Sequence, residues 1–183
     1  MKHIIVIIFL ISPKVIFAQD DVISITFTEE NAKYWQYISD RTMGGISDGK
    51  AVLDKEGDRY FARLTGNVST ENNGGFIQLR STLSFINFDK RSINLKGVRI
   101  KVRGNGEVYH IFIRTSDTRS YRDYHAATFI AEDQWTIVDL PFSKFKNRFS
   151  NKELDGNDIR TFGIVAYGRN FQSDVSVSEI NLY

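Results

Sequence analysis

Alternation of apolar and polar residues constrains this chain more than any other feature. In 97-GVRIKVRG-104, valine or isoleucine takes every second position, and arginine or lysine takes the positions between them. Successive side chains of a β-strand point to opposite faces, so this segment predicts a strand with one buried and one solvated face. A chain built from such segments must bury each apolar row against another sheet.

Similar runs recur along the chain and are separated by turn-forming residues such as Gly104-Asn105-Gly106. Their alternation predicts strands over 22–28, 59–65, 76–81, 97–104, 108–115, 124–131, 135–141, 160–168 and 175–183. We therefore predict an all-β fold, a single-domain β-sandwich.

Helical patterns are weak and occur in two places. Residues 29–36 have the composition of a short helix. In 142–149, Phe142, Phe145 and Phe149 recur at helical spacing and would share one side. We expect short helices at both places.

The N-terminus predicts a secretory signal peptide, residues 1–18. A short basic start precedes an apolar run over 4–12, and Ala18 supplies a small residue for cleavage. Pro13 and Lys14 interrupt the apolar run, which is short for a membrane span, although an uncleaved anchor is the alternative. We expect an exported chain, periplasmic or secreted, whose mature domain (19–183) does not span a membrane.

Charge and cysteine content exclude several classes of protein. The chain has 24 Lys+Arg and 22 Asp+Glu, and removal of Lys2 and Lys14 with the signal peptide leaves 22 of each. This balance argues against a nucleic-acid partner. The chain has no cysteine, which excludes disulfides, thiol nucleophiles and zinc–thiolate sites. An exported chain without disulfides suits a bacterial envelope.

The glycine-rich stretch 42-TMGGISDGK-50 predicts either a tight turn or a loop that lies against a ligand. In the simpler interpretation, Asp40 and Asp48 bond nearby backbone N–H groups and Trp35 belongs to the core. A lone methionine more often fills a gap in the core than recognises a partner, so we expect Met43 to be buried.

Two strand faces are candidate binding surfaces. A turn at 72–75 precedes a strand that places Phe76, Gln78 and Arg80 on one face, with Ile77 and Leu79 on the other. The first face could bind a sugar or a peptide, or it could be a solvated sheet face. The basic row of 97–104 could bind carboxylate groups, or it could serve solubility and block edge pairing.

Catalytic motifs are absent from the sequence. His110 and His125 stand alone, without the spacing of a zinc site. The chain has no G-x-S-x-G, Walker or dinucleotide-binding motif. We therefore expect no enzymatic activity, no metal and no cofactor.

Four blocks, in order, resemble the signature of a known family: 35-WQYISDRTMGGISDG-49, 69-STENNGGFIQLRS-81, 97-GVRIKVRGNGEVY-109 and 135-WTIVDLPFSKF-145. Together they resemble the complex I intermediate-associated protein 30 family (NADH:ubiquinone oxidoreductase intermediate-associated protein 30 domain). The resemblance implies a galactose-binding-like jelly-roll sandwich without catalytic activity. It also implies a protein partner, because mitochondrial members of the family hold assembly intermediates of respiratory complex I.

Two functions follow from this resemblance. The first is a protein-binding assembly or chaperone-like module of the envelope, for which a subunit of a respiratory or envelope complex is the expected partner. The alternative is a carbohydrate-binding module, with Tyr121, Arg122 and Tyr124 of the 117–125 loop as further candidates. The candidate binding residues that match the family are Trp35, Asp40, Met43, Gly44, Gly45, Ser47, Asp48, Asn73, Gly74, Gly75, Phe76, Arg80, Arg103 and Tyr109.

Overall fold

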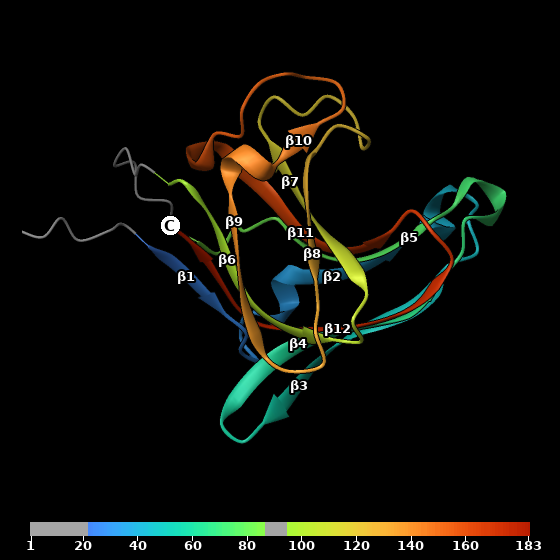
Figure 1. Ribbon diagram of the computed structural model, residues 1–183, viewed down its shortest axis with the longest axis horizontal. Helices are drawn as coiled ribbons and strands as arrows, with labels where there is room; N and C mark the ends of the chain where they lie inside the picture. The colour runs from blue at the N-terminus through green and yellow to red at the C-terminus, as the bar shows by residue number, and fades with distance from the viewer. Residues whose placement is uncertain (1–21, 87–94) are drawn as a thin grey trace, which may run out of the picture.

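Two antiparallel sheets face each other across one apolar core in the computed structural model (Figure 1). The structure describes residues 22–86 and 95–183. The predicted signal peptide, residues 1–18, lies outside the described residues. Within the described part, no helix is long and apolar enough to cross a membrane.

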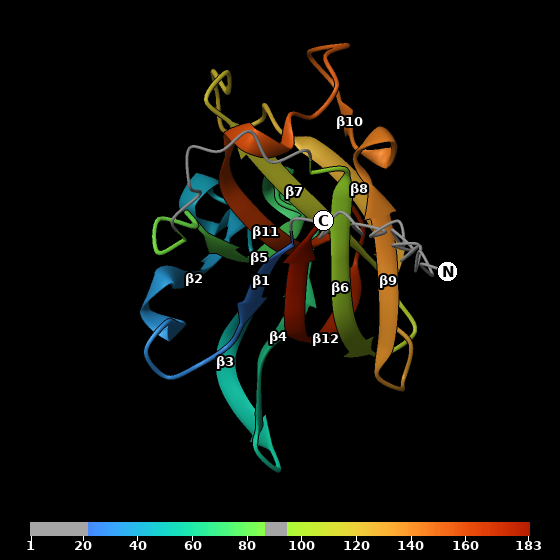
Figure 2. The ribbon, with the colours of Figure 1, turned by 90° about the vertical axis from the view of Figure 1, so that its left-hand side faces the viewer.

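Each sheet has six strands, and all strand pairs are antiparallel. Sheet A runs in the order β3 (Asp48–Glu56), β4 (Arg59–Val68), β12 (Phe171–Leu182), β6 (Gly97–Gly104) and β9 (Thr136–Pro141), and β1 (Ile23–Thr26) also pairs with β12. Sheet B runs in the order β10 (Lys146–Asn147), β8 (His125–Ile130), β7 (Val108–Thr115), β11 (Ile159–Tyr167), β5 (Phe76–Ser81) and β2 (Trp35–Ser39). Figure 2 shows β1, β12, β6 and β9 of sheet A side by side.

The core is built from the inward rows of these strands, as the alternating pattern predicted. Val98, Ile100 and Val102 of β6 are fully buried, while the basic residues between them face outward. Tyr109 and Phe162, from β7 and β11, are fully buried on the opposite side of the core. Each aliphatic or aromatic side chain of this kind contributes about 2 kcal/mol when it is removed from water.

All nine predicted strands are present, and the structure adds β2, β3 and β10. The helix expected over 29–36 is only a 3₁₀ turn, Ala32–Tyr34, after which β2 begins at Trp35. An extended backbone there places Trp35 and Tyr37 against the core, which a helix beginning at 29 would not do.

The helix expected over 142–149 is also wrong. A 3₁₀ turn spans Phe142–Lys144, and the chain then extends to pair with β8 as β10. Phe142 and Phe145 are buried, with ring centroids 6.2 Å apart, but Phe149 is 63% exposed. The three rings therefore do not share a side, because the backbone does not keep a helical period past Lys144.

Tyr109 is a fully buried side chain with a polar group, and it lies near the start of β7. Its hydroxyl donates to Asn105 Oδ1 at 2.7 Å and accepts the backbone N–H of Asp174 at 2.8 Å. Burial, as the largest cause, raises the pKa of Tyr109, so the phenol is neutral when it makes these bonds. The hydroxyl thus fastens the β6–β7 hairpin to β12.

We expect Tyr109→Phe to lower the free energy of unfolding by about 2 kcal/mol, because the part-buried Asp174 N–H loses its acceptor and Asn105 Oδ1 loses its donor. Urea denaturation would measure this loss. The matched control is Tyr121→Phe, at a side chain that is 59% exposed, and should change stability by less than about 0.5 kcal/mol. Equal stability of the two variants would contradict the role assigned to the Tyr109 hydroxyl.

Candidate functional site

The first two family blocks meet at the buried carboxylate of Asp40. This residue begins the 3₁₀ turn Asp40–Met43 and has no exposed surface. Its Oδ1 accepts the Ser47 N–H at 3.0 Å, and its Oδ2 accepts the Ser47 hydroxyl at 2.5 Å. Oδ2 also accepts the N–H groups of Gly75 at 2.5 Å and Phe76 at 3.1 Å. The carboxylate therefore joins the loop after β2 to the turn before β5.

The glycines of both blocks make room for this carboxylate. A Cβ at Gly45 would overlap the Asp40 carboxyl group, and a Cβ at Gly74 would lie 2.6 Å from its Oδ2. Only glycine permits so close an approach without displacing the buried charge. Gly44, at φ 88°, and Asn73, at φ 59°, supply the backbone reversals on either side. The tight turns predicted from the glycines are confirmed.

Asp40 is ionised in the folded protein at neutral pH. Burial is the largest single influence and raises its pKa, but the hydrogen bonds from Ser47, Gly75 and Phe76 together outweigh it. The net effect is a pKa below the ordinary value for an aspartate. The charge is thus stabilised by donors from two separate segments of the chain.

The rim of the same loop faces solvent. Met43 is 45% exposed and Ile46 is 44% exposed, so the expectation that Met43 is buried is wrong. The space beneath the loop holds the Asp40 carboxylate and its donors, which leaves no apolar pocket for the thioether. Asp48 lies at the surface, where it pairs with Arg41 at 3.3 Å.

The third and fourth blocks meet on the outer face of sheet A. The guanidinium of Arg103 lies over the Trp135 ring, 4.7 Å from its centroid. Glu56 accepts the indole N–H of Trp135 at 3.0 Å and pairs with Arg103 at 3.4 Å. The bond from Trp135, followed by the charge of Arg103, lowers the pKa of Glu56. Trp35 of the first block instead lies in the interior, 5.0 Å from Phe27 between ring centroids.

The basic row of β6 is neutralised by acidic side chains of the same sheet. Besides the Arg103 pair, Arg99 binds Asp139 at 2.6 Å and Lys101 lies 3.8 Å from Glu179. The basic side chains on the outer face of sheet A are therefore paired with acidic ones. This is typical of a solvated sheet face and does not favour a binding site for acidic ligands.

The outer face of sheet B has a different chemistry. Ile77 and Leu79 of β5 enter the core, while Phe76, Gln78 and Arg80 face outward, as predicted. The outward side chains of β7 and β11 continue this surface across the sheet, because the strand register places Arg80 and Phe112 on either side of Gly163. We call the following set the aromatic–arginine face: Gln78, Arg80, His110, Phe112, Arg114, Tyr124 and Tyr167.

Aromatic rings form the centre of this face. Phe112 and Tyr124 are stacked, with centroids 3.9 Å apart and an interplanar angle of 17°. Tyr167 meets Phe112 edge-on at 5.4 Å, and His110 meets Phe112 at 5.8 Å. The Arg114 guanidinium lies 5.4 Å from the Tyr124 ring centroid. Phe112 is buried by these neighbours although it does not belong to the core.

Several polar atoms of this surface have unused hydrogen-bonding capacity. Gln78 Oε1, His110 Nδ1, Arg114 Nη1 and the neighbouring Thr161 Oγ1 are buried and have no hydrogen-bond partner among the described residues. Buried polar groups usually have partners, so four exceptions on one face call for an explanation.

Protonation on the aromatic–arginine face follows from its burial. Burial, followed by the charge of Arg169, lowers the pKa of His110 and favours a neutral imidazole. Burial, followed by the neighbouring Tyr167, raises the pKa of Tyr124 to about 12. At neutral pH the face thus carries neutral rings and hydroxyls beside two cationic arginines.

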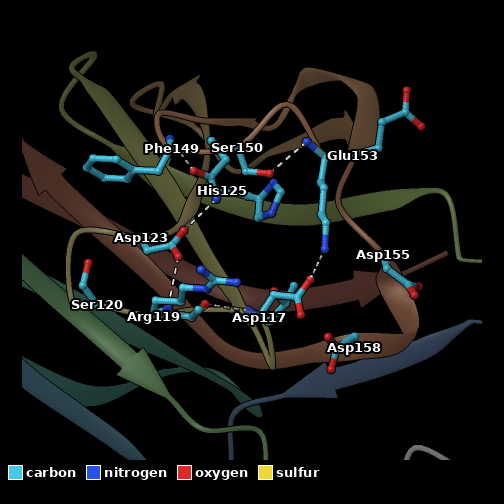
Figure 3. A pocket seen from close by; sticks show the side chains of 14 residues that line it. Asp117, Arg119, Ser120, Asp123, His125, Phe149, Ser150, Glu153, Asp155 and Asp158 are labelled. Carbon is cyan, nitrogen blue, oxygen red and sulfur yellow. Dashed lines mark hydrogen bonds and ion pairs between the residues drawn. The ribbon is translucent and has the colours of Figure 1, made fainter.

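A cavity of about 720 Å³ lies at one end of sheet B, between the loop after β7 and the segment after β10 (Figure 3). Two of its charged side chains have partners in the lining, since Lys152 pairs with Asp117 at 2.7 Å and Asp123 accepts the Asn147 amide at 2.9 Å. Among the described residues, no group of three His, Cys, Asp or Glu side chains could hold a metal ion. His125 lines the cavity, and burial lowers its pKa.

The candidate residues divide by their placement. Asp40, Ser47 and Tyr109 are buried, and their side chains bond within the protein. Phe76, Arg80 and, from the 117–125 loop, Tyr124 come together on the outer face of sheet B. The sequence interpretation did not single out His110, Phe112, Arg114 and Tyr167 as one surface. The outward positions of β7 and β11 would have indicated them, had the strand order been known.

We expect Asp40→Asn to lower the free energy of unfolding at pH 7 by about 3 kcal/mol, because an amide cannot accept from all four donors and leaves buried groups unpaired. The pKa of Asp40 is depressed, so its stabilising effect is present above the unfolded value of about 3.9 and is lost as pH falls through the folded value. Urea denaturation at pH 7 and below pH 4 would test both points. The control Asp48→Asn lies in the same motif but at the surface. A stability difference for Asp40→Asn that stays constant with pH would contradict this account.

The fold and the sequence blocks agree with comparisons to known proteins. Three solved structures of carbohydrate-binding modules share the fold at 14% sequence identity. A family 11 module from Clostridium thermocellum, in complex with a β-1,3-1,4-mixed-linked tetrasaccharide, has a TM-score of 0.65 over 87% of this chain and 94% of that chain. The family 11 module of the cellulosomal cellulase Lic26A-Cel5E of the same organism has a TM-score of 0.63 over 81% and 86%. A family 30 module has a TM-score of 0.53 over 75% and 77%.

The sequence comparisons are more specific. No curated protein matches the chain. The profile of the family described as complex I intermediate-associated protein 30 matches residues 25–176, a range that contains all four blocks. The chain therefore belongs to the complex I intermediate-associated protein 30 family, with a galactose-binding-like β-sandwich fold.

Proposed function

We propose that this protein is an exported, non-enzymatic binding module that holds a glycan on its aromatic–arginine face. The observation that carries the proposal is the cluster of stacked rings beside buried polar atoms that have no partner among the described residues. The predicted signal peptide would deliver the domain to the periplasm or the exterior of a bacterial cell. There it would meet polysaccharides of the envelope or of the surroundings.

The chemistry of this face suits a sugar. A pyranose has an apolar C–H surface that lies against aromatic rings, and its rim of hydroxyls needs directional donors and acceptors. Tyr124 and Tyr167 supply ring surface and hydroxyl groups, while Gln78 supplies an amide and Arg80 a guanidinium. Gln78, Arg80 and Tyr167 project from neighbouring strands, and Tyr124 precedes β8 and stacks on Phe112, so these groups need little ordering on binding.

The fold comparison supports the same proposal at a coarser level. The family 11 module described above was solved with a bound tetrasaccharide, so a sandwich of this fold can serve as a carbohydrate-binding module. At 14% identity the comparison concerns the fold alone. The choice of face and of residues in this chain therefore depends on its own side chains.

We expect the full chain to be retarded in gels that contain one or more soluble polysaccharides from a panel of neutral and charged polymers. Tyr124→Ala should weaken that binding about tenfold, because it removes a ring that the sugar would contact. The control is Tyr60→Ala on sheet A, whose hydroxyl bonds Glu29 at 2.8 Å, and its binding should be unchanged. Normal migration in every polymer of the panel would overturn the proposed function.

A second candidate function is that of a protein-binding assembly module, as the family's name suggests. Met43 and Ile46 favour it, because they expose apolar surface at the rim of a loop that Asp40 fixes from below. Apolar side chains on a rigid loop can contact a partner without a large loss of conformational entropy.

Under this second function, Met43→Asp should abolish co-purification of a protein partner from envelope extract, because a carboxylate replaces the apolar contact. Ile137→Asp is the matched control, since Ile137 is 65% exposed on β9 of sheet A and should leave the partner bound. Retention of the partner by the Met43 variant would rule out this loop as the contact surface.

A further inference from the structure

The two arginines of the aromatic–arginine face differ from those of sheet A in having no acidic partner. Arg99 and Arg103 each lie within 3.4 Å of a carboxylate oxygen. Among the described residues, neither Arg80 nor Arg114 forms an ion pair. A buried arginine is usually paired with a carboxylate. The arginines of sheet A are paired in this way, whereas those of the aromatic–arginine face are not.

Arg114 is the more constrained of the two. Its Nη2 donates to the backbone carbonyl of Tyr121 at 2.8 Å, while its Nη1 is buried and has no partner among the described residues. Burial, followed by the positive charge of Arg80, lowers the pKa of Arg114. The two cations therefore destabilise each other, and the protein keeps both on one half-buried surface.

Asp123 does not form an ion pair with Arg114, although its charge acts to raise the pKa of that arginine. Both of its oxygens are already occupied, by the Asn147 amide at 2.9 Å and by the Arg119 N–H at 3.0 Å. The positive charge of the face thus remains available to a ligand.

Gly163 places no side chain of its own between the two strands that carry the arginines. It lies on β11, opposite Arg80 of β5 on one side and Phe112 of β7 on the other. Because glycine has no side chain, no group rises from β11 at this point to separate a ligand from the rings and the guanidinium groups. A flat ring can lie on this strip with its substituents directed toward the arginines.

We propose that the ligand of this face is an anionic glycan, whose carboxylate or sulfate groups bind Arg80 and Arg114 while a sugar ring lies on the tyrosine cluster. The inference rests on the proposed glycan-binding function and specifies the class of glycan. A neutral sugar would satisfy single hydrogen bonds but would leave two mutually repelling cations uncompensated. A carboxylate or sulfate accepts two parallel N–H donors from a guanidinium and neutralises its charge at a site where water is partly excluded.

The test compares polymers that differ mainly in charge. Binding of the full chain to polygalacturonate is measured by titration calorimetry against highly methyl-esterified polygalacturonate, in which the carboxylates are masked. Dextran sulfate against dextran provides the sulfate arm and distinguishes the two kinds of anionic group. We expect an anionic polymer to bind at least about tenfold more tightly than its neutral counterpart.

Substitutions assign the effect to the face. Arg114→Gln and Arg80→Gln should each weaken binding of the anionic polymer about tenfold and weaken binding of the neutral polymer by a smaller factor. Arg99→Gln removes the same charge from sheet A, where the arginine is paired with Asp139, and should have no effect. Because Arg114 also donates to a backbone carbonyl, thermal unfolding of each variant is measured to confirm that it is folded.

The possible failures are distinguishable. Equal affinity for the charged and neutral polymers would overturn the inference that the ligand is anionic. It would still agree with the proposed glycan-binding function. If Arg99→Gln weakens binding of the anionic polymer as much as Arg80→Gln and Arg114→Gln do, the polymer is attracted by net charge alone. That result would also overturn the inference. Absence of binding to every polymer overturns the proposed function and, with it, this inference.

Discussion

The carboxylate of Asp40 is the interaction on which the rest of the sandwich depends. It is fully buried and accepts four hydrogen bonds, two from Ser47 and two from Gly75 and Phe76, which lie 35 and 36 residues further along the chain than Asp40. A buried charge is tolerated only where its donors are already in place, so the glycines at 45 and 74 follow directly from it. This joint fixes where β3 and β5 begin, and β5 carries one edge of the aromatic–arginine face.

The family signature therefore describes how the sandwich is held together. Its first two blocks meet at Asp40, and its last two meet where Arg103 lies over Trp135. Most of the surface formed by β7, β11 and the loop before β8 lies outside those blocks. The residues that identify the family and those that the proposed ligand would contact are thus largely different. Arg80 belongs to both sets, because it follows the Asp40 joint on β5.

The sequence predicted what depends on local periodicity. Strand alternation gave the sandwich, the nine strands and the outward row Phe76, Gln78 and Arg80. It missed β3, an edge strand whose charged and glycine residues resemble a loop, and β10, which has only two residues. It also missed the grouping of Arg80 with Phe112, because that contact depends on β11 lying between β5 and β7. The order of strands in a sheet is set by tertiary packing, and no periodic pattern of residues in the sequence indicates it.

Gly163 has a consequence for how such a protein can diverge. It sits on the outside of a central strand, where the nearest atom to an added Cβ would be Gln78 Oε1 at an ordinary contact distance of 3.4 Å. A Cβ there would make only ordinary contacts, and a larger side chain would extend into the strip between the arginine-bearing strands. A single substitution at this position would therefore change the outer surface of sheet B and leave the core and the Asp40 carboxylate unchanged.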